Sequence, residues 1–188
     1  MGYIKEYYEA IIRLQEDEWQ FIAARFRERK YDRGAVITKA GQKEQFLSFI
    51  EKGMVRHYIP GDEQDITFCF GFDREFTCAY DSFITQTPAT YEVQALTPLI
   101  LWQISYGDLQ QVYSCTRAGN HIGRYAAEQL FLSKSRRERY LLQFTATDRY
   151  LMLLEQEPHI IKQVPLKYIA SYIGITPQAL SRIRRRIT

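Results

Sequence analysis

The sequence is poor in the residues from which metal sites and disulfide frameworks are built. It holds three cysteines and three histidines, namely Cys69, Cys78, Cys115, His57, His121 and His159. An odd number of widely spaced cysteines excludes a fully paired disulfide framework, and their spacing contains no CxxC metal motif. Because the histidines form no HxH or HExxH pattern, we predict no metal site.

Long apolar runs are also lacking. No run approaches the roughly 20 apolar residues that a membrane-spanning helix needs. The N-terminus, MGYIKEYYEAIIRL, has acidic residues among its apolar ones, so it lacks the basic start and apolar centre of a secretory signal. The composition, 46% hydrophobic and 25% charged, is ordinary for a globular protein. We therefore expect a soluble, cytoplasmic protein with no membrane partner.

Acidic residues are absent from the end of the chain. The last one is Glu157, and residues 158–188 hold six Lys or Arg, although the net charge of the chain is only +3. A short basic segment after a mildly acidic body predicts a local site for a polyanion.

The pattern of apolar and turn residues divides the 188 residues into zones. Apolar residues at helical spacing within residues 3–30 predict one or two amphipathic helices. Between Tyr31 and Ile104, short runs such as FLSFIEKG and TYEVQAL alternate with turn glycines, which predicts an antiparallel β-sandwich or barrel. The length suits one medium domain followed by a small one.

A long helix is predicted after the β-rich zone. The stretch NHIGRYAAEQLFLSKSRRERYLLQF is long enough for about six helical turns, and Ile122, Ala126 and Leu130 form an apolar stripe along it. Because one β-domain could not cover so long a stripe, we expect residues 116–142 to pack against a second copy of the chain. The stretch TDRYLMLLEQEP then predicts a further helix that stops at Pro158.

Residues 164–188 predict a helix, a tight turn and a second helix. The apolar residues of LKYIASYI recur at helical spacing, which indicates a short helix with one buried face. Gly174 follows where a C-terminal cap is expected. Thr176 can cap the next helix, and Pro177 fits its first turn.

The second of these helices has two different faces. Its apolar face, which includes Leu180 and Ile183, should pack on the first helix. The other face carries amide, hydroxyl and guanidinium groups, which bond base edges in a major groove or contact phosphates. The predicted DNA-binding residues are Lys167, Thr176, Gln178, Ser181, Arg182, Arg184, Arg185 and Arg186. The alternative is a solvated basic helix that only closes a helical subdomain.

Together with this ending, the stretch YDRGAVITKAGQKEQFLSFIEKGMVRHY resembles the Crp-Fnr superfamily of bacterial transcription regulators, with Gly34, Gly41 and Gly53 at the turns of a cyclic-nucleotide-binding domain. The resemblance implies an α+β fold: an N-terminal antiparallel, jelly-roll-like β-roll with flanking helices, a long dimerisation helix and a C-terminal helix-turn-helix domain. The implied boundaries are 1–115, 116–144 and 145–188. The family implies a homodimer with recognition helices in successive major grooves.

The sequence departs from the family pattern where a cyclic nucleotide would bind. Members that bind cyclic AMP have a Gly-Glu pair and an Arg-Ser or Arg-Thr pair, whereas Cys78-Ala79 and Ala89-Thr90 stand at those places here. A buried cyclic phosphate would lack its charge partner, so cyclic AMP binding in the usual manner is not expected. Many relatives also continue into a β-hairpin wing, and with the sequence ending at Thr188 no full wing is expected.

What occupies the β-roll stays open at this point. The resemblance implies that an effector would contact Thr77, Cys78, Tyr80, Thr90, Tyr91, Lys134 and Ser135. A nucleotide held in another way, an apolar or aromatic ligand, and a plain β-roll core with no ligand all fit these residues.

The leading interpretation is a sequence-specific DNA-binding regulator that is not an enzyme and has no cofactor. Its expected partners are double-stranded DNA, a second copy of the chain and a small effector, with RNA polymerase as a further candidate. A cupin-like metal enzyme is one alternative, although cupins need clustered His and Glu ligands. A ligand-sensing module without a direct DNA role is the other.

Overall fold

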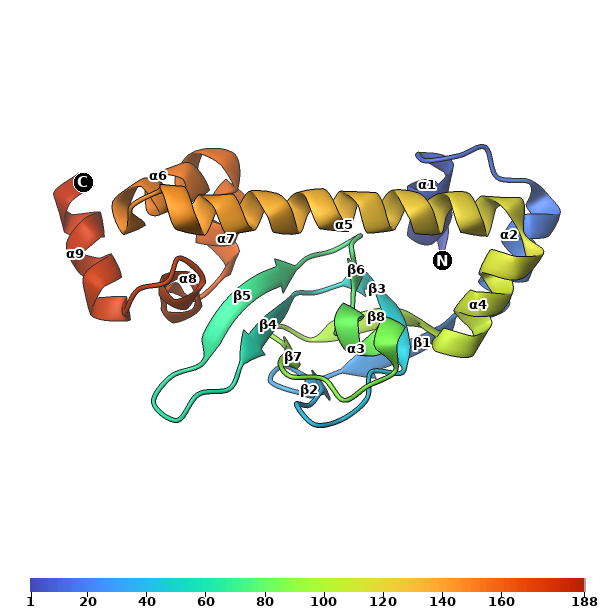
Figure 1. Cartoon of the computed structure of the whole chain (residues 1–188), viewed down its shortest axis with the longest axis horizontal. Coiled ribbons are helices and arrows are strands. Elements are labelled where there is room, and N and C mark those ends of the chain that lie inside the picture. The colour runs from blue at the N-terminus through green and yellow to red at the C-terminus, as the bar shows by residue number, and fades with distance from the viewer. Residues whose placement is uncertain (188) are drawn as a thin grey trace. The chain divides into compact units, whose positions relative to one another are not determined.

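The computed structural model describes residues 1–187 and divides into two compact units (Figure 1). The first unit contains Met1–His57 and Phe70–Gln129, and the second contains Tyr58–Cys69 and Leu130–Thr188. Both units are therefore built from segments that are not contiguous in the sequence. Within residues 1–187, no helix is long and apolar enough to cross a membrane.

Two antiparallel sheets form the β-roll that the sequence predicted. In the first sheet the strand order is β1 (Arg27–Tyr31), β8 (Leu99–Ser105), β3 (Phe46–Lys52) and β6 (Phe76–Thr77). In the second sheet the order is β2 (Val36–Thr38), β7 (Glu92–Ala95), β4 (Val55–Ile59) and β5 (Ile66–Gly71). The ends of β4 and β5 that meet in their connecting turn belong to the second unit.

Gly53 makes the tight turn between β3 and β4 possible. Its φ is +111°, a conformation that residues with a side chain rarely adopt. A Cβ atom at this position would also lie 2.5 Å from the carbonyl oxygen of Pro98. The glycine predicted at a turn of the β-rich zone is therefore required both by conformation and by space.

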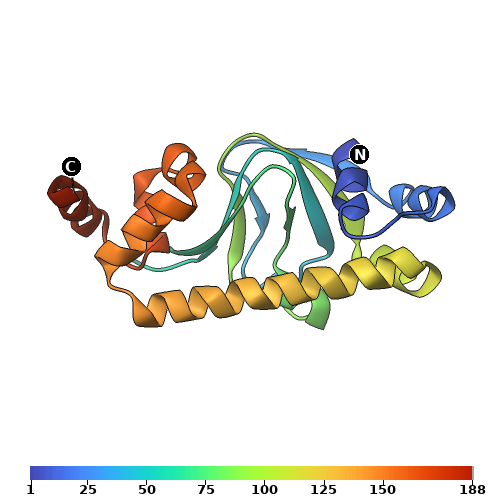
Figure 2. The ribbon, with the colours of Figure 1, turned by 90° about the horizontal axis from the view of Figure 1, so that it is seen from above.

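Helices cover one side of the β-roll within the first unit. Figures 1 and 2 place α1 (Gly2–Glu9), α2 (Glu16–Ala23) and α4 (Tyr106–Cys115) near the start of α5 (Arg117–Gln143). Their apolar faces share one core, to which Ile4, Ile22, Leu109 and Ile122 contribute together with Phe49 of β3. Burial of this surface is the main stabilising contribution in the unit.

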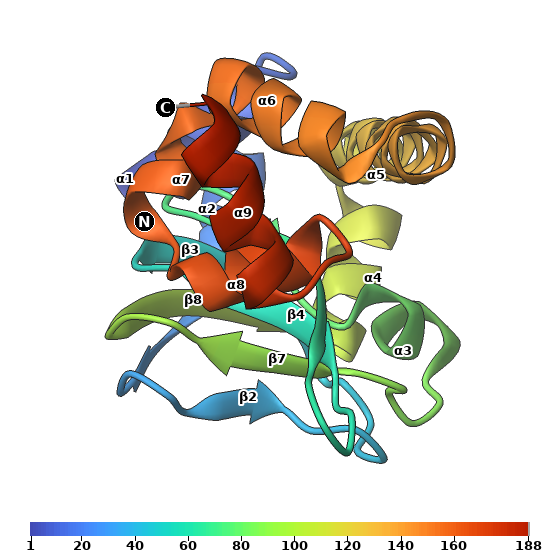
Figure 3. The same ribbon diagram turned by 90° about the vertical axis from the view of Figure 1, so that its left-hand side faces the viewer.

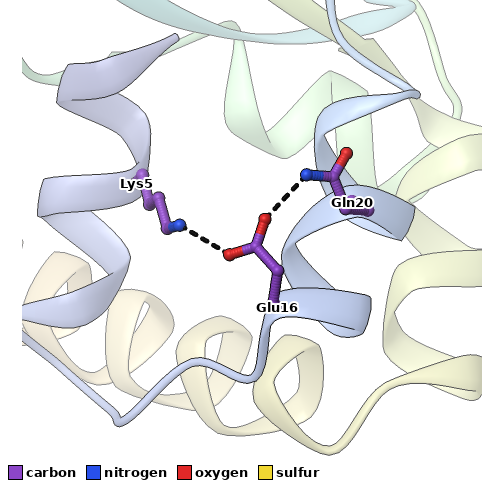
Figure 4. Close-up of polar contacts among 3 residues, drawn as sticks. All are labelled: Lys5, Glu16 and Gln20. Carbon is purple, nitrogen blue, oxygen red and sulfur yellow. Dashed lines mark hydrogen bonds and ion pairs between the residues drawn. The ribbon is translucent and has the colours of Figure 1, made fainter.

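A polar bridge at the surface joins α1 to α2 (Figure 4). The Nζ atom of Lys5 donates to Glu16 at 2.9 Å, and the amide of Gln20 donates to the same carboxylate at 2.7 Å. The hydrogen bond from Lys5 lowers the pKa of Glu16. Because the bridge is open to solvent, it orients the two helices more than it stabilises them.

The long helix forms as predicted. One residue of its apolar stripe, however, does not face a second copy of the chain as we expected. Ile122 is 7% exposed and packs in the core of the first unit, because the helix begins against α1, α2 and α4. It is thus unavailable to a second copy of the chain. The apolar side chains that α5 leaves exposed are Tyr125, Phe131, Leu132, Leu141 and Leu142.

Besides the hairpin tip and the end of α5, the second unit contains the short helices α6 (Ala146–Gln156), α7 (Pro158–Gln163), α8 (Leu166–Tyr172) and α9 (Pro177–Ile187) (Figure 3). Thr145 and Asp148 form a capping box at the start of α6. This helix ends before Pro158, as expected, and only Glu157 separates it from α7. Pro158 is the first residue of α7, where its fixed φ suits a first turn. The centre of the unit buries Tyr150, Leu153, Ile160, Ile169 and Leu180.

Candidate functional sites

The turn between α8 and α9 is fixed by its own backbone. Gly174 has a φ of +77°. Its N–H donates to the carbonyl of Ser171 at 3.0 Å, and the N–H of Ile175 donates to Ala170 at 3.0 Å. This is the Schellman arrangement that ends many helices. The Thr176 hydroxyl then accepts from the N–H of Ala179 at 3.2 Å, so it caps α9 as predicted from the sequence.

The α9 helix buries one face and leaves the other in solvent. Leu180 is 1% exposed and anchors the helix in the second unit. All eight residues predicted to bind DNA are exposed: Lys167, Thr176, Gln178, Ser181, Arg182, Arg184, Arg185 and Arg186. Gln178, Ser181, Arg182 and Arg185 lie on one side at about 100° per residue. The exposed side can therefore present hydrogen-bond donors and positive charge to a polyanion.

Two arginines outside these helices hold the end of α8. Arg137 of α5 donates to the carbonyl of Tyr172, and its guanidinium lies 3.8 Å from the centre of that ring. Arg149 of α6 donates through Nε to the carbonyl of Ile173 at 3.0 Å. Cations at a helix C-terminus satisfy the last carbonyls and interact favourably with the helix dipole. Burial raises the pKa of Tyr172 to about 12, although Arg137 opposes the shift.

In the β-roll, some of the proposed effector residues are buried and others are not. Thr77 and Cys78 are buried, Tyr80 and Tyr91 are half-buried, and Thr90 is exposed. Burial raises the pKa of the Cys78 thiol, and it is also the main cause of the raised pKa of Tyr91, which bonds to Asp81 as well. The structure thus supplies a polar neighbourhood in the roll, but not one continuous exposed surface.

His57 joins this neighbourhood, and sequence reasoning missed it. Its Nε2 lies 2.8 Å from the hydroxyl of Thr77, and its ring centre is 6.0 Å from that of Tyr91. A single histidine in a β-rich stretch carried no signal, because only the pairing of β4 with its neighbours places it near these residues.

A buried carboxylate, that of Glu44 in the loop between β2 and β3, lies next to the proposed effector residues. Glu44 is 7% exposed and accepts from the hydroxyl of Thr38 and from the N–H groups of Gln45, Phe46 and Ala79, the last three at 3.0, 3.1 and 3.2 Å. Ala79 directly precedes α3 (Tyr80–Thr85), a helix that the sequence did not predict within the β-rich zone. The chain's own carboxylate therefore satisfies the amide at the start of this helix.

Two of the residues that the resemblance sets at the cyclic AMP contacts are apolar and closed. Ala79 is fully buried and Ala89 is 3% exposed. Lys134 and Ser135 lie in the second unit, where Lys134 is 5.3 Å from the ring centre of Phe68 and Ser135 accepts from Arg139 at 3.5 Å. Their contact with an effector shared with Thr77 and Tyr91 stays a prediction.

Residues 28–114 match the family model described as the cyclic nucleotide-binding domain. Among curated proteins no sequence match is found. In residues 1–187, no group of three or more His, Cys, Asp or Glu side chains is arranged to hold a metal ion.

Solved structures share the fold over most of the chain. The c-di-GMP-responsive global regulator CLP of Xanthomonas campestris has a TM-score of 0.69 and 19% identity, with 92% of this chain and 91% of that chain covered. FixK2 of Bradyrhizobium japonicum has a TM-score of 0.71 and 15% identity, with 86% and 84% covered. A putative regulator of the Crp/Fnr family from Eubacterium rectale has a TM-score of 0.67 and 19% identity, with 93% and 83% covered.

These comparisons define the β-roll as resembling a cyclic nucleotide-binding domain. More particularly, over most of its length the chain shares the fold of solved Crp/Fnr-type regulators, which confirms the fold that the resemblance implied.

Proposed function

We propose that this chain is a sequence-specific DNA-binding transcription regulator of the Crp-Fnr type that acts as a homodimer and not as an enzyme. The observation that carries the proposal is the α9 helix, whose buried Leu180 anchors it while its polar, basic face stays exposed. Helices presented in this way enter a major groove with their early residues at base edges. Gln178, Ser181 and Arg182 would contact bases, and Arg184 and Arg186 would contact phosphates.

The exposed apolar residues of α5 support the dimer. Tyr125, Leu132 and Leu142 fall in the series 125, 128, 132, 135, 139 and 142, in which steps of three and four residues alternate, although Glu128, Ser135 and Arg139 fill the other three places. This is the spacing of a two-helix seam. A second copy of α5 would bury these side chains, which are 40%, 52% and 79% exposed in the single chain.

The effector role of the β-roll is part of the proposal, with Thr77, Cys78, Tyr80, Thr90, Tyr91, Lys134 and Ser135 as the candidate contacts. Closed apolar positions at Ala79 and Ala89, and the carboxylate of Glu44 on the amide of Ala79, argue against a cyclic phosphate held in the usual manner. We propose the functional division 1–115, 116–144 and 145–188, with RNA polymerase as a further partner.

Selection of bound sequences from random DNA tests this function directly. Purified protein is incubated with the pool with and without cell-extract metabolites, and the enriched sequences are read. A palindromic motif with half-sites one helical turn apart is the expected result. Failure to enrich any motif under either condition would favour the ligand-sensing module without a DNA role, and a stoichiometric transition metal in the purified protein would favour the enzyme.

A further inference from the structure

The tip of the β4–β5 hairpin folds as part of the second unit, together with the helices that carry the proposed DNA-binding residues. One hydroxyl group makes two hydrogen bonds to the hairpin. Ser171 Oγ in the last turn of α8 accepts from the N–H of Thr67 at 2.8 Å and donates to the carbonyl of Asp65 at 2.8 Å. These partners lie 104 and 106 residues away in the sequence.

The geometry of these two bonds matches the open edge of a strand. β5 is the last strand of its sheet, so one of its sides has no neighbouring strand. The carbonyl of residue 65 and the N–H of residue 67 point to the same side of an extended chain, where one residue of a parallel neighbour would bond to both. The hydroxyl of Ser171 replaces that residue, since a hydroxyl can donate and accept at once.

We propose that Ser171 is a positioning residue for DNA recognition, which fixes α8, and with it α9, to the hairpin. This inference rests on the proposed DNA-binding function. A dimer reads a palindrome only when its two recognition helices are held roughly 34 Å apart. Within the second unit, a hydroxyl that ties α8 to β5 limits how freely the reading helices can move away from that spacing.

The neighbouring arginine contacts at this end of α8 do not reach the hairpin. Arg137 and Arg149 hold the carbonyls of Tyr172 and Ile173, but they come from α5 and α6 within the same unit. Lys134 stacks on Phe68 of β5 and adds a second, weaker attachment to the hairpin. The side chain of Ser171, in contrast, bonds directly to the backbone of the hairpin.

The test compares three variants of the full chain: Ser171→Ala, which loses both bonds; Ser171→Thr, which keeps the hydroxyl; and Ser114→Ala, an exposed hydroxyl of α4 as the matched control. We expect Ser171→Ala to bind a selected palindrome about five- to thirty-fold more weakly, with unchanged affinity for a duplex that holds a single half-site. Ser171→Thr and Ser114→Ala should bind both like the unmodified protein.

A second measurement does not depend on DNA. Hydrogen exchange of the Thr67 amide should accelerate by roughly tenfold in Ser171→Ala and return to its original rate in Ser171→Thr. Unchanged exchange would overturn the docking, and equal losses for palindrome and half-site would overturn the positioning role. If the unmodified protein enriched no DNA motif, the proposed function would fall, while the exchange rates would still decide whether Ser171 holds the hairpin.

Discussion

At the scale of single residues, neighbouring arginines of α9 should have different effects on DNA binding. Arg182 follows Ser181 on the exposed side at the middle of the helix, ahead of the other arginines and nearer the end at which a recognition helix meets base edges. Arg184 and Arg186 lie beside this side and nearer the C-terminal end. Arg182 is therefore expected to contribute to sequence specificity. Arg184 and Arg186 are expected to contact phosphates of any DNA duplex.

We expect Arg182→Ala to cost about 1–3 kcal/mol of binding free energy and to relax the preference at one base pair in each half-site. Arg184→Ala and Arg186→Ala should weaken all sequences alike and reduce the salt dependence by about one unit for each lost contact. Binding to a selected palindrome and its single-base variants at several salt concentrations separates the two effects. A uniform loss for Arg182→Ala would leave α9 as a solvated basic helix.

The cysteines should differ strongly in reactivity. Cys78 is 8% exposed and burial raises its pKa well above the usual value, whereas Cys115 is exposed. Because the thiolate is the reactive form, Cys115 should be alkylated first at neutral pH and Cys78 only after unfolding. Mass spectrometry of peptides after timed iodoacetamide treatment gives the order. Early modification of Cys78 would show that the β-roll opens readily in solution.

Glu44 should be important for stability even though it lies in a loop. Glu44→Ala leaves the buried Thr38 hydroxyl and the Ala79 amide without their acceptor, so we expect a loss of about 2–3 kcal/mol in the free energy of unfolding. Urea denaturation measures the loss, with exposed Glu9→Ala as the matched control. Equal midpoints for the two variants would contradict the structural role of this carboxylate.

At the scale of elements, local signals predicted the ending well. Gly174 and Thr176 act within a few residues of themselves, so their types alone indicated the turn and the cap. The role of Ile122 could not be inferred in this way, because periodicity identifies an apolar face without showing which surface covers it. Glu44 and Ser171 were missed for the same reason, since their partners lie 35 to 106 residues away.

The exposed face of α5 should set the association of the chain. Leu132→Glu combined with Leu142→Glu places carboxylates at two exposed apolar positions of the proposed seam, and we expect the dimer dissociation constant to rise at least about tenfold. Ser133→Glu combined with Gln143→Glu, each about 100° further round the helix and exposed, is the control. Sedimentation measures the mass, and an unmodified protein that is monomeric at micromolar concentration would contradict the dimer.

At the scale of the whole molecule, the β-roll should not respond to cyclic AMP. The closed positions at Ala79 and Ala89 lead us to expect no binding of cyclic AMP at micromolar concentration. Calorimetric titration of the full chain is the measurement. One molecule bound per chain with a micromolar or lower dissociation constant would contradict this expectation. It would show that another cation takes the role of the arginine in the family's Arg-Ser or Arg-Thr pair, and Lys134 would be the first residue to mutate.

The order of segments along the chain also limits how such a protein can be recombined. Because residues 58–69 belong with α6–α9, no single crossover point separates the two units. A chimera that received residues 130–188 from one parent and the rest from another would pair Ser171 with a foreign hairpin. Exchange of DNA specificity between related proteins by simple fusion should therefore succeed only when both parents present the same backbone edge to α8.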